Sequence, residues 1–129
     1  MPVLNKTQQP VDASSVVAYL IRKHRIRPND QYSLSRVFRL LELAQNYTQL
    51  RSKKSLFSGD NTAISKILME YSQRKRSLDL NPKLPVLTQA VLDAVWDTYG
   101  NYPPSMLQEF TYMQQAKLGT EKQVMARQR

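Results

Sequence analysis

The fold is decided by residues 32–50, which read YSLSRVFRLLELAQNYTQL. This stretch is the longest and most apolar helical pattern in the chain, and its apolar side chains cover more than half of a helix circumference. A helix that packs on one side needs an apolar stripe only a little wider than ~100°. We therefore expect a long central helix at about 33–56, with Ser33 as its N-cap and neighbours on several sides. The polar positions form a narrow strip: Ser35, Arg39, Glu42, Asn46, Gln49 and Lys53.

Four further helices are predicted from 3.6-residue periodicity and from the residues that start and stop helices. They cover about 13–25, 62–76, 86–99 and 104–118. Gly59 is expected to end the central helix in a left-handed conformation, and Gly119 to end the last helix. The sequence therefore predicts an all-α single domain, residues 1–118, with about five helices around the central one. Residues 1–11 are expected to be a flexible arm, and residues 119–129 a basic, disordered tail.

Composition narrows the class of protein. The 129 residues carry a net charge of +9 and include no cysteine, which excludes disulfide scaffolds and thiolate metal sites. No apolar run approaches the ~18 residues that a membrane span requires. These features favour a cytoplasmic protein with no membrane association.

The positive charge is unevenly distributed along the chain. Residues 22–83 hold fourteen Lys and Arg against five Asp and Glu, a net of +9, whereas residues 84–116 hold three acids and no base. Soluble surfaces usually intersperse the two signs. The segregation predicts one basic face and one neutral face.

Three basic clusters lie at the C-terminal ends of the expected helices. Cations in a last helical turn interact favourably with the helix dipole, but this accounts for only part of each cluster. Separate clusters along one face, with Arg36, Arg39 and Lys66 between them, suit an extended polyanion such as RNA or DNA, bound through its phosphates. In an up–down bundle the first and third clusters would share one pole and the second would lie at the other. The ten residues expected to contact nucleic acid are Arg22, Lys23, Arg25, Arg27, Arg51, Lys53, Lys54, Arg74, Lys75 and Arg76.

Two other functions remain open at this point. One is a sequence-specific helix-turn-helix regulator, in which residues 62–76 form the recognition helix and Asn61, Thr62, Ser65 and Lys66 face bases. The other is a basic adaptor that binds only protein. Tyr19, Tyr32, Tyr47 and Tyr71 lie among the basic segments, where they would either stack on unpaired bases or pack in the core.

Catalysis finds little support in the sequence. His24, the only histidine, lies in a cationic run that would lower its pKa, and no carboxylate beside it in the sequence would orient it. Asp93 and Asp97 share a helix face, as two acids on a solvated strip do. There is no glycine-rich phosphate loop and no nucleophile at a motif spacing. We expect no enzymatic activity, no metal and no cofactor.

The neutral segment is rich in large apolar residues. Trp, Tyr and Met are enriched in the cores of protein interfaces, so part of this segment is expected to dock on another protein subunit or on another copy of the chain. The residues expected to bind that partner are Trp96, Tyr99, Tyr102, Phe110 and Tyr112.

The chain resembles the small, all-helical subunits of CRISPR RNA-guided effector complexes of the Cascade type. The resemblance rests on the size, on the Ser33-Leu34-Ser35-Arg36-Val37-Phe38 entry to a long apolar helix, on the separate basic clusters and on the aromatic C-terminal helices. It implies a non-catalytic subunit, repeated along a filament, whose basic face contacts guide or target strands. The ten basic residues named above would take that role.

Overall fold

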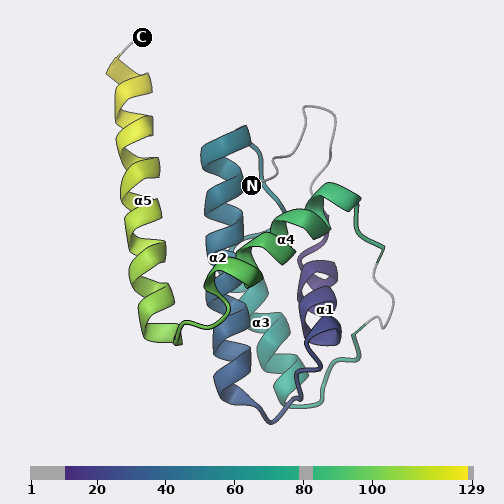
Figure 1. Ribbon diagram of the computed structural model, residues 1–129. Helices are drawn as coiled ribbons and strands as arrows, with labels where there is room; N and C mark the ends of the chain where they lie inside the picture. Colours follow the sequence, from purple (N-terminus) through teal and green to yellow (C-terminus); the bar gives the residue numbers. More distant parts are fainter. Residues whose placement is uncertain (1–10, 79–82, 128–129) are drawn as a thin grey trace.

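Five α-helices make up the structure, a computed structural model that describes residues 11–78 and 83–127, with side chains up to residue 120. They are α1 (Ala13–Lys23), α2 (Gln31–Ser52), α3 (Asn61–Ser72), α4 (Val86–Tyr99) and α5 (Pro104–Arg127). The prediction of an all-α bundle of about five helices is confirmed. In Figure 1, α1, α2 and α3 lie together, α4 crosses in front of α2, and α5 stands along the outer side of α2. The expected arm, residues 1–11, lies almost wholly outside the described residues.

The helix α2 contacts each of the other four helices. Its buried apolar side chains include Leu34, Val37, Leu40, Leu41 and Leu43. Three residues of the same helix are polar and nevertheless buried. Thr48 is satisfied within the helix, because its hydroxyl donates to the Ala44 carbonyl at 2.8 Å. Glu42, which the sequence places on the polar strip, is only 6% exposed, because α3 covers it and Asn61 donates a hydrogen bond to it. Gln45 is buried as well, for a reason given below.

The two ends of α2 differ from the sequence prediction. Asp30, and not Ser33, is the N-cap: its carboxylate accepts hydrogen bonds from the backbone N–H and the hydroxyl of Ser33. The helix ends at Ser52, before residue 56, and Lys53 takes the left-handed conformation expected at Gly59. Gly59 also has a positive φ, but it lies just before Asp60, the N-cap of α3. A Cβ added at Gly59 would lie 3.1 Å from the Cβ of Ala63.

The segment between α2 and α3 folds back onto the core through Gln45. The Gln45 side-chain oxygen accepts from the backbone N–H groups of Leu56, at 2.6 Å, and Phe57, at 3.3 Å. Its amide nitrogen donates to the Phe57 carbonyl at 3.1 Å. These bonds satisfy a non-helical backbone in the interior, where an unpaired polar group is costly. Leu56 and Phe57 can therefore be fully buried although they lie outside any helix.

The helix α5 is longer than predicted and packs on fewer neighbours. The prediction that Gly119 ends it at residue 118 is wrong: α5 continues to Arg127, because residues 120–127 are mostly good helix formers and no proline intervenes. Its substantial contacts are with α2. Among the side chains of α5 that the structure describes, Leu107 and Thr111 are buried, whereas Met106 and Met113 are exposed.

Candidate nucleic-acid interface

The ends of α1 and α3 meet at one pole of the bundle, the lower right in Figure 1. The Tyr71 hydroxyl of α3 donates a 2.7 Å hydrogen bond to the carbonyl of Ile26, just beyond α1, and burial raises the pKa of this tyrosine. A hollow of about 350 Å³ lies between these segments, and its lining includes Arg22, Arg25 and Arg27. We call this end the basic pole and define it by Arg22, Arg25, Arg27, Arg74, Lys75 and Arg76.

Both helices end at the basic pole in the same backbone motif. After α1, the N–H groups of Arg25 and Ile26 bond to the carbonyls of Arg22 and Ile21. After α3, those of Arg74 and Lys75 bond in the same way to Tyr71 and Glu70. This is the Schellman arrangement, whose left-handed residue is usually glycine. Here it is Arg25, with φ 54°, and Arg74, with φ 58°.

A third cation shares this conformation. Lys53 caps α2 with φ 61°. Among the described residues, Arg25, Lys53 and Arg74 are the non-glycine positions with positive φ, and each belongs to a different one of the three basic clusters. The left-handed region costs an L-residue roughly 1–2 kcal/mol. Each cluster therefore holds one cation in a backbone conformation that favours glycine.

Lys23 and Arg76 form ion pairs with acids. The Lys23 ammonium lies 2.7 Å from the Asp93 carboxylate of α4, and the Tyr19 hydroxyl donates to the same carboxylate at 2.8 Å. The hydrogen bond to Asp93 is the main reason that the pKa of Lys23 is raised. Arg76 pairs with Glu70 at 3.4 Å. Lys23 is thus directed toward α4, and for this reason the basic pole is defined without it.

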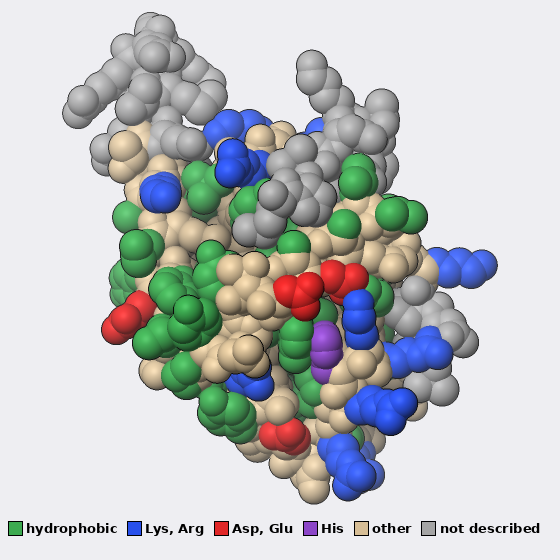
Figure 2. All heavy atoms as spheres, in the orientation of Figure 1, with side chains coloured by type: hydrophobic (Ala, Val, Ile, Leu, Met, Phe, Trp, Pro, Cys, Tyr) green, Lys and Arg blue, Asp and Glu red, His purple; other side chains and the backbone are tan. Residues whose placement is uncertain are grey.

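The second cluster lies away from the basic pole. Arg51 lies in the last turn of α2, and Lys53 and Lys54 follow it; this helix runs from the pole to the opposite end of the bundle (Figure 1). Figure 2 shows Lys and Arg side chains gathered at the lower right and a separate group near the top. Arg36 and Arg39, two of the residues expected to connect the clusters, have different partners. Arg36 packs over the rings of Tyr32 and Trp96, whereas Arg39 pairs with Glu42.

His24 lies beside the basic pole and against α4. Its ring stacks on that of Trp96, with centroids 3.5 Å apart and planes within 6°. Burial, and next the charge of Lys23, lower the pKa of His24, while Asp93 and Asp97 act in the opposite direction. The sequence predicted the direction of this shift but missed the carboxylates, because they come from a helix seventy residues away. The purple side chain in Figure 2 lies directly below two acidic ones.

The predicted tyrosines and partner-binding residues separate into packed and exposed groups. Tyr19 and Tyr71 are held by hydrogen bonds, Tyr47 packs against the core, and Tyr32 is 57% exposed. Trp96 is covered by His24, whereas Tyr99, Tyr102 and Phe110 form one aromatic cluster with ring centroids 5.3–6.4 Å apart. Tyr112 is 70% exposed, and the sequence missed its exposed neighbours Met106 and Met113.

The geometry between α2 and α3 differs from a helix-turn-helix motif. That motif joins its helices by a turn of about three to four residues, whereas residues 53–60 separate these two. Of the expected base-reading residues, Asn61 is bound to Glu42, and Thr62, Ser65 and Lys66 are exposed.

No protein-family model, curated protein or solved structure matches this chain. The resemblance to CRISPR effector small subunits therefore stays a prediction. Within residues 11–78 and 83–120, no three His, Cys, Asp or Glu side chains gather as a metal site would require. The helices of the described part are too short or too polar to cross a bilayer.

Proposed function

We propose that this chain is a non-catalytic subunit that binds the phosphate backbone of RNA or DNA, with the basic pole as its main contact. The observation that carries the proposal is the identity of the three left-handed residues: Arg25, Lys53 and Arg74. Glycine is the residue that this conformation favours. A cation at all three sites is accounted for if the charge is needed where the helix ends.

The gathering of cations at the basic pole supports the same function. The pole joins six cations from two segments, 22–27 and 74–76, that lie more than forty residues apart in the sequence, and Glu70 is paired to one of them. Clustered cations on one surface raise the local concentration of a polyanion and speed its association. Phosphate contacts of this kind give affinity without reading the sequence. The resemblance to CRISPR effector small subunits is compatible with this role and would supply the assembly in which the chain works.

Salt dependence of binding tests the proposal directly. The purified protein is titrated into a fluorescent single strand and a fluorescent duplex of arbitrary sequence, from about 50 to 300 mM salt. Each phosphate contact contributes a slope of about −0.7 to −0.9 in log K against log salt. We expect a slope of about −3 to −5, from four to six contacts at the basic pole, and the same affinity for unrelated sequences. Absence of binding at the lowest salt, or affinity indifferent to salt, would refute the function.

Charge reversal locates the contact. Arg27→Glu with Lys75→Glu changes the charge of the pole by four units and avoids the left-handed positions. The matched control, Lys83→Glu with Lys117→Glu, makes the same change in net charge on other segments. We expect the first pair to abolish binding at 150 mM salt and the control pair to weaken it only several-fold. Equal losses from both pairs would mean that net charge alone acts.

A further inference from the structure

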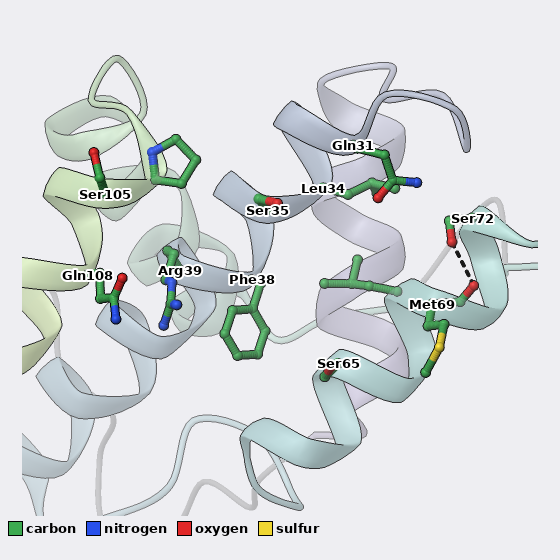
Figure 3. A pocket seen from close by; sticks show the side chains of 12 residues that line it. Gln31, Leu34, Ser35, Phe38, Arg39, Ser65, Met69, Ser72, Ser105 and Gln108 are labelled. Atoms are coloured by element: carbon green, nitrogen blue, oxygen red, sulfur yellow. Dashed lines mark hydrogen bonds between the residues drawn. The ribbon is translucent and has the colours of Figure 1, made fainter.

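A groove of about 540 Å³ lies between α2, α3 and the first turn of α5. Clefts of about 300–1,000 Å³ are typical of ligand sites. Figure 3 shows the Phe38 ring hanging into the groove from α2, with Ser65 and Met69 of α3 on one side and Arg39 and Gln108 on the other. Its lining is Gln31, Leu34, Ser35, Phe38, Arg39, Ser65, Leu68, Met69, Ser72, Pro104, Ser105 and Gln108.

The lining has the chemistry that recognises an uncharged planar ligand with polar edges. Half of the residues are serine or glutamine, one is a cation, and none is an acid. The side-chain amides of Gln31 and Gln108 have both donors and acceptors. An aromatic ring with a guanidinium beside it is the usual stacking surface for an unpaired base.

Arg39 is held in place at the groove. The buried Glu42 carboxylate accepts from Arg39 at 2.7 Å through one oxygen and from Asn61 at 2.9 Å through the other. The guanidinium carbon then lies 5.1 Å from the centre of the Phe38 ring. This pair of planar groups is therefore set by contacts within the chain before any ligand arrives.

The groove opens toward the end of the bundle that carries the basic pole. Gln31 begins α2 there, and Ser72 ends α3 two residues before Arg74. A strand whose phosphates contact the pole would reach the groove with its next bases. A duplex keeps its bases stacked inside and could not present one to Phe38.

From this arrangement we propose that the groove between α2, α3 and α5 holds an unpaired base of a single-stranded nucleic acid against Phe38 and Arg39. The inference rests on the proposed function, since the phosphates of the same strand are bound at the basic pole. It adds a preference that backbone contacts alone would not give. The chain binds single strands more tightly than duplexes of equal length.

A single strand carrying 2-aminopurine tests the groove, because the fluorescence of this base is quenched when it stacks. We expect quenching on binding, and its loss in Phe38→Leu, which keeps an apolar side chain against the core. Ser65→Leu narrows the groove from an exposed position without adding an aromatic ring and should have the same effect. Either change should weaken single-strand binding about 5- to 100-fold and leave duplex binding unchanged. The control is Tyr112→Leu, which removes an exposed aromatic ring outside the groove.

The outcomes separate this inference from the proposed function. Quenching that disappears in both groove variants, with circular dichroism unchanged, supports the base site. Salt-dependent binding without quenching, or with equal affinity for duplex and single strand, overturns the base site and leaves the function intact. Quenching that survives in Ser65→Leu also overturns it, whatever happens to the stability of Phe38→Leu. Absence of all nucleic-acid binding at low salt overturns both.

Discussion

Replacing Arg25 and Arg74 by glycine should make the protein more stable and a weaker ligand for nucleic acid. Both residues hold a left-handed backbone, at φ 54° and 58°, where an L-residue pays roughly 1–2 kcal/mol. Glycine avoids this cost, but it has more conformational freedom in the unfolded chain, so ordering it on folding costs about 0.5–1 kcal/mol more. The net gain is about 0.5–1 kcal/mol at each site. The two residues end different helices, so the double variant should gain about 1–2 kcal/mol.

The assay is urea unfolding followed by far-ultraviolet circular dichroism, together with a thermal melt. A gain of 1–2 kcal/mol corresponds to an increase in Tm of about 3–10 °C for a chain of this size. The same variant should lose two phosphate contacts. The slope of log K against log salt would then become shallower by about 1.4 for a single strand and about 1.8 for a duplex.

Two controls separate charge from backbone strain. Arg25→Lys with Arg74→Lys keeps both the charge and the left-handed cost, so stability and the salt slope should stay the same. Asparagine at both sites tolerates the left-handed region and removes the charge, so it should weaken binding with a smaller gain in stability. A glycine variant that is less stable would refute the argument, because the arginine side chains would then be stabilising the fold. A more stable variant with an unchanged salt slope would remove the functional reason for the cations.

Three further predictions follow from other contacts. Gln45→Leu leaves two backbone N–H groups and one carbonyl buried without partners and should destabilise the fold by about 2–4 kcal/mol in urea unfolding; a loss below 1 kcal/mol would show that the segment re-solvates freely. The lowered pKa of His24 means that stability falls as pH drops below its unfolded value of about 6.5, by at most about 1.4 kcal/mol per pH unit, and His24→Phe should flatten the profile between pH 5 and 7. Asp93→Asn removes an ion pair that is well exposed to solvent and should cost less than about 1 kcal/mol, so a larger loss in a thermal melt would contradict that exposure.

The sequence predicts the helices well because their signals are local. Prolines and a well-defined apolar pattern mark α4, whose predicted limits of 86–99 are those of the structure. Apolar periodicity also identifies α2, but it places the end of this helix four residues too late. Leu56 and Phe57 continue the apolar pattern, and only the long-range clamp from Gln45 shows that they are buried outside a helix.

The candidate site is only partly visible in the sequence. Clusters of Lys and Arg are counted easily, and an up–down order places the first and third at one pole, but the Tyr71–Ile26 hydrogen bond that joins the two ends across forty-five residues has no sequence signal. The groove combines residues from three helices, and Phe38 looks like one more core residue on its own helix. The exposure of Met106 and Met113 cannot be predicted from apolar periodicity, because periodicity does not say how many neighbours a helix has. With α2 as its main neighbour, α5 leaves Met106 and Met113 in solvent.

Cations at helix ends can serve stability or the binding of a ligand, and the left-handed residues argue against stability alone. A cation near a helix C-terminus gains about 0.3–1 kcal/mol from the helix dipole, and α1 already has Arg22 and Lys23 in its last turn. A further cation at Arg25 adds at most the same amount and costs roughly 1–2 kcal/mol in backbone strain. Glycine at that site would keep the dipole interactions of the last turn without the strain. Stability alone therefore does not explain Arg25, and the same reasoning applies to Lys53, since α2 has Arg51 in its last turn. The last turn of α3 has no cation, so for Arg74 the comparison is a dipole gain of at most about 1 kcal/mol against a strain of roughly 1–2 kcal/mol. A requirement for charge at these sites, such as contact with a polyanion, would explain all three.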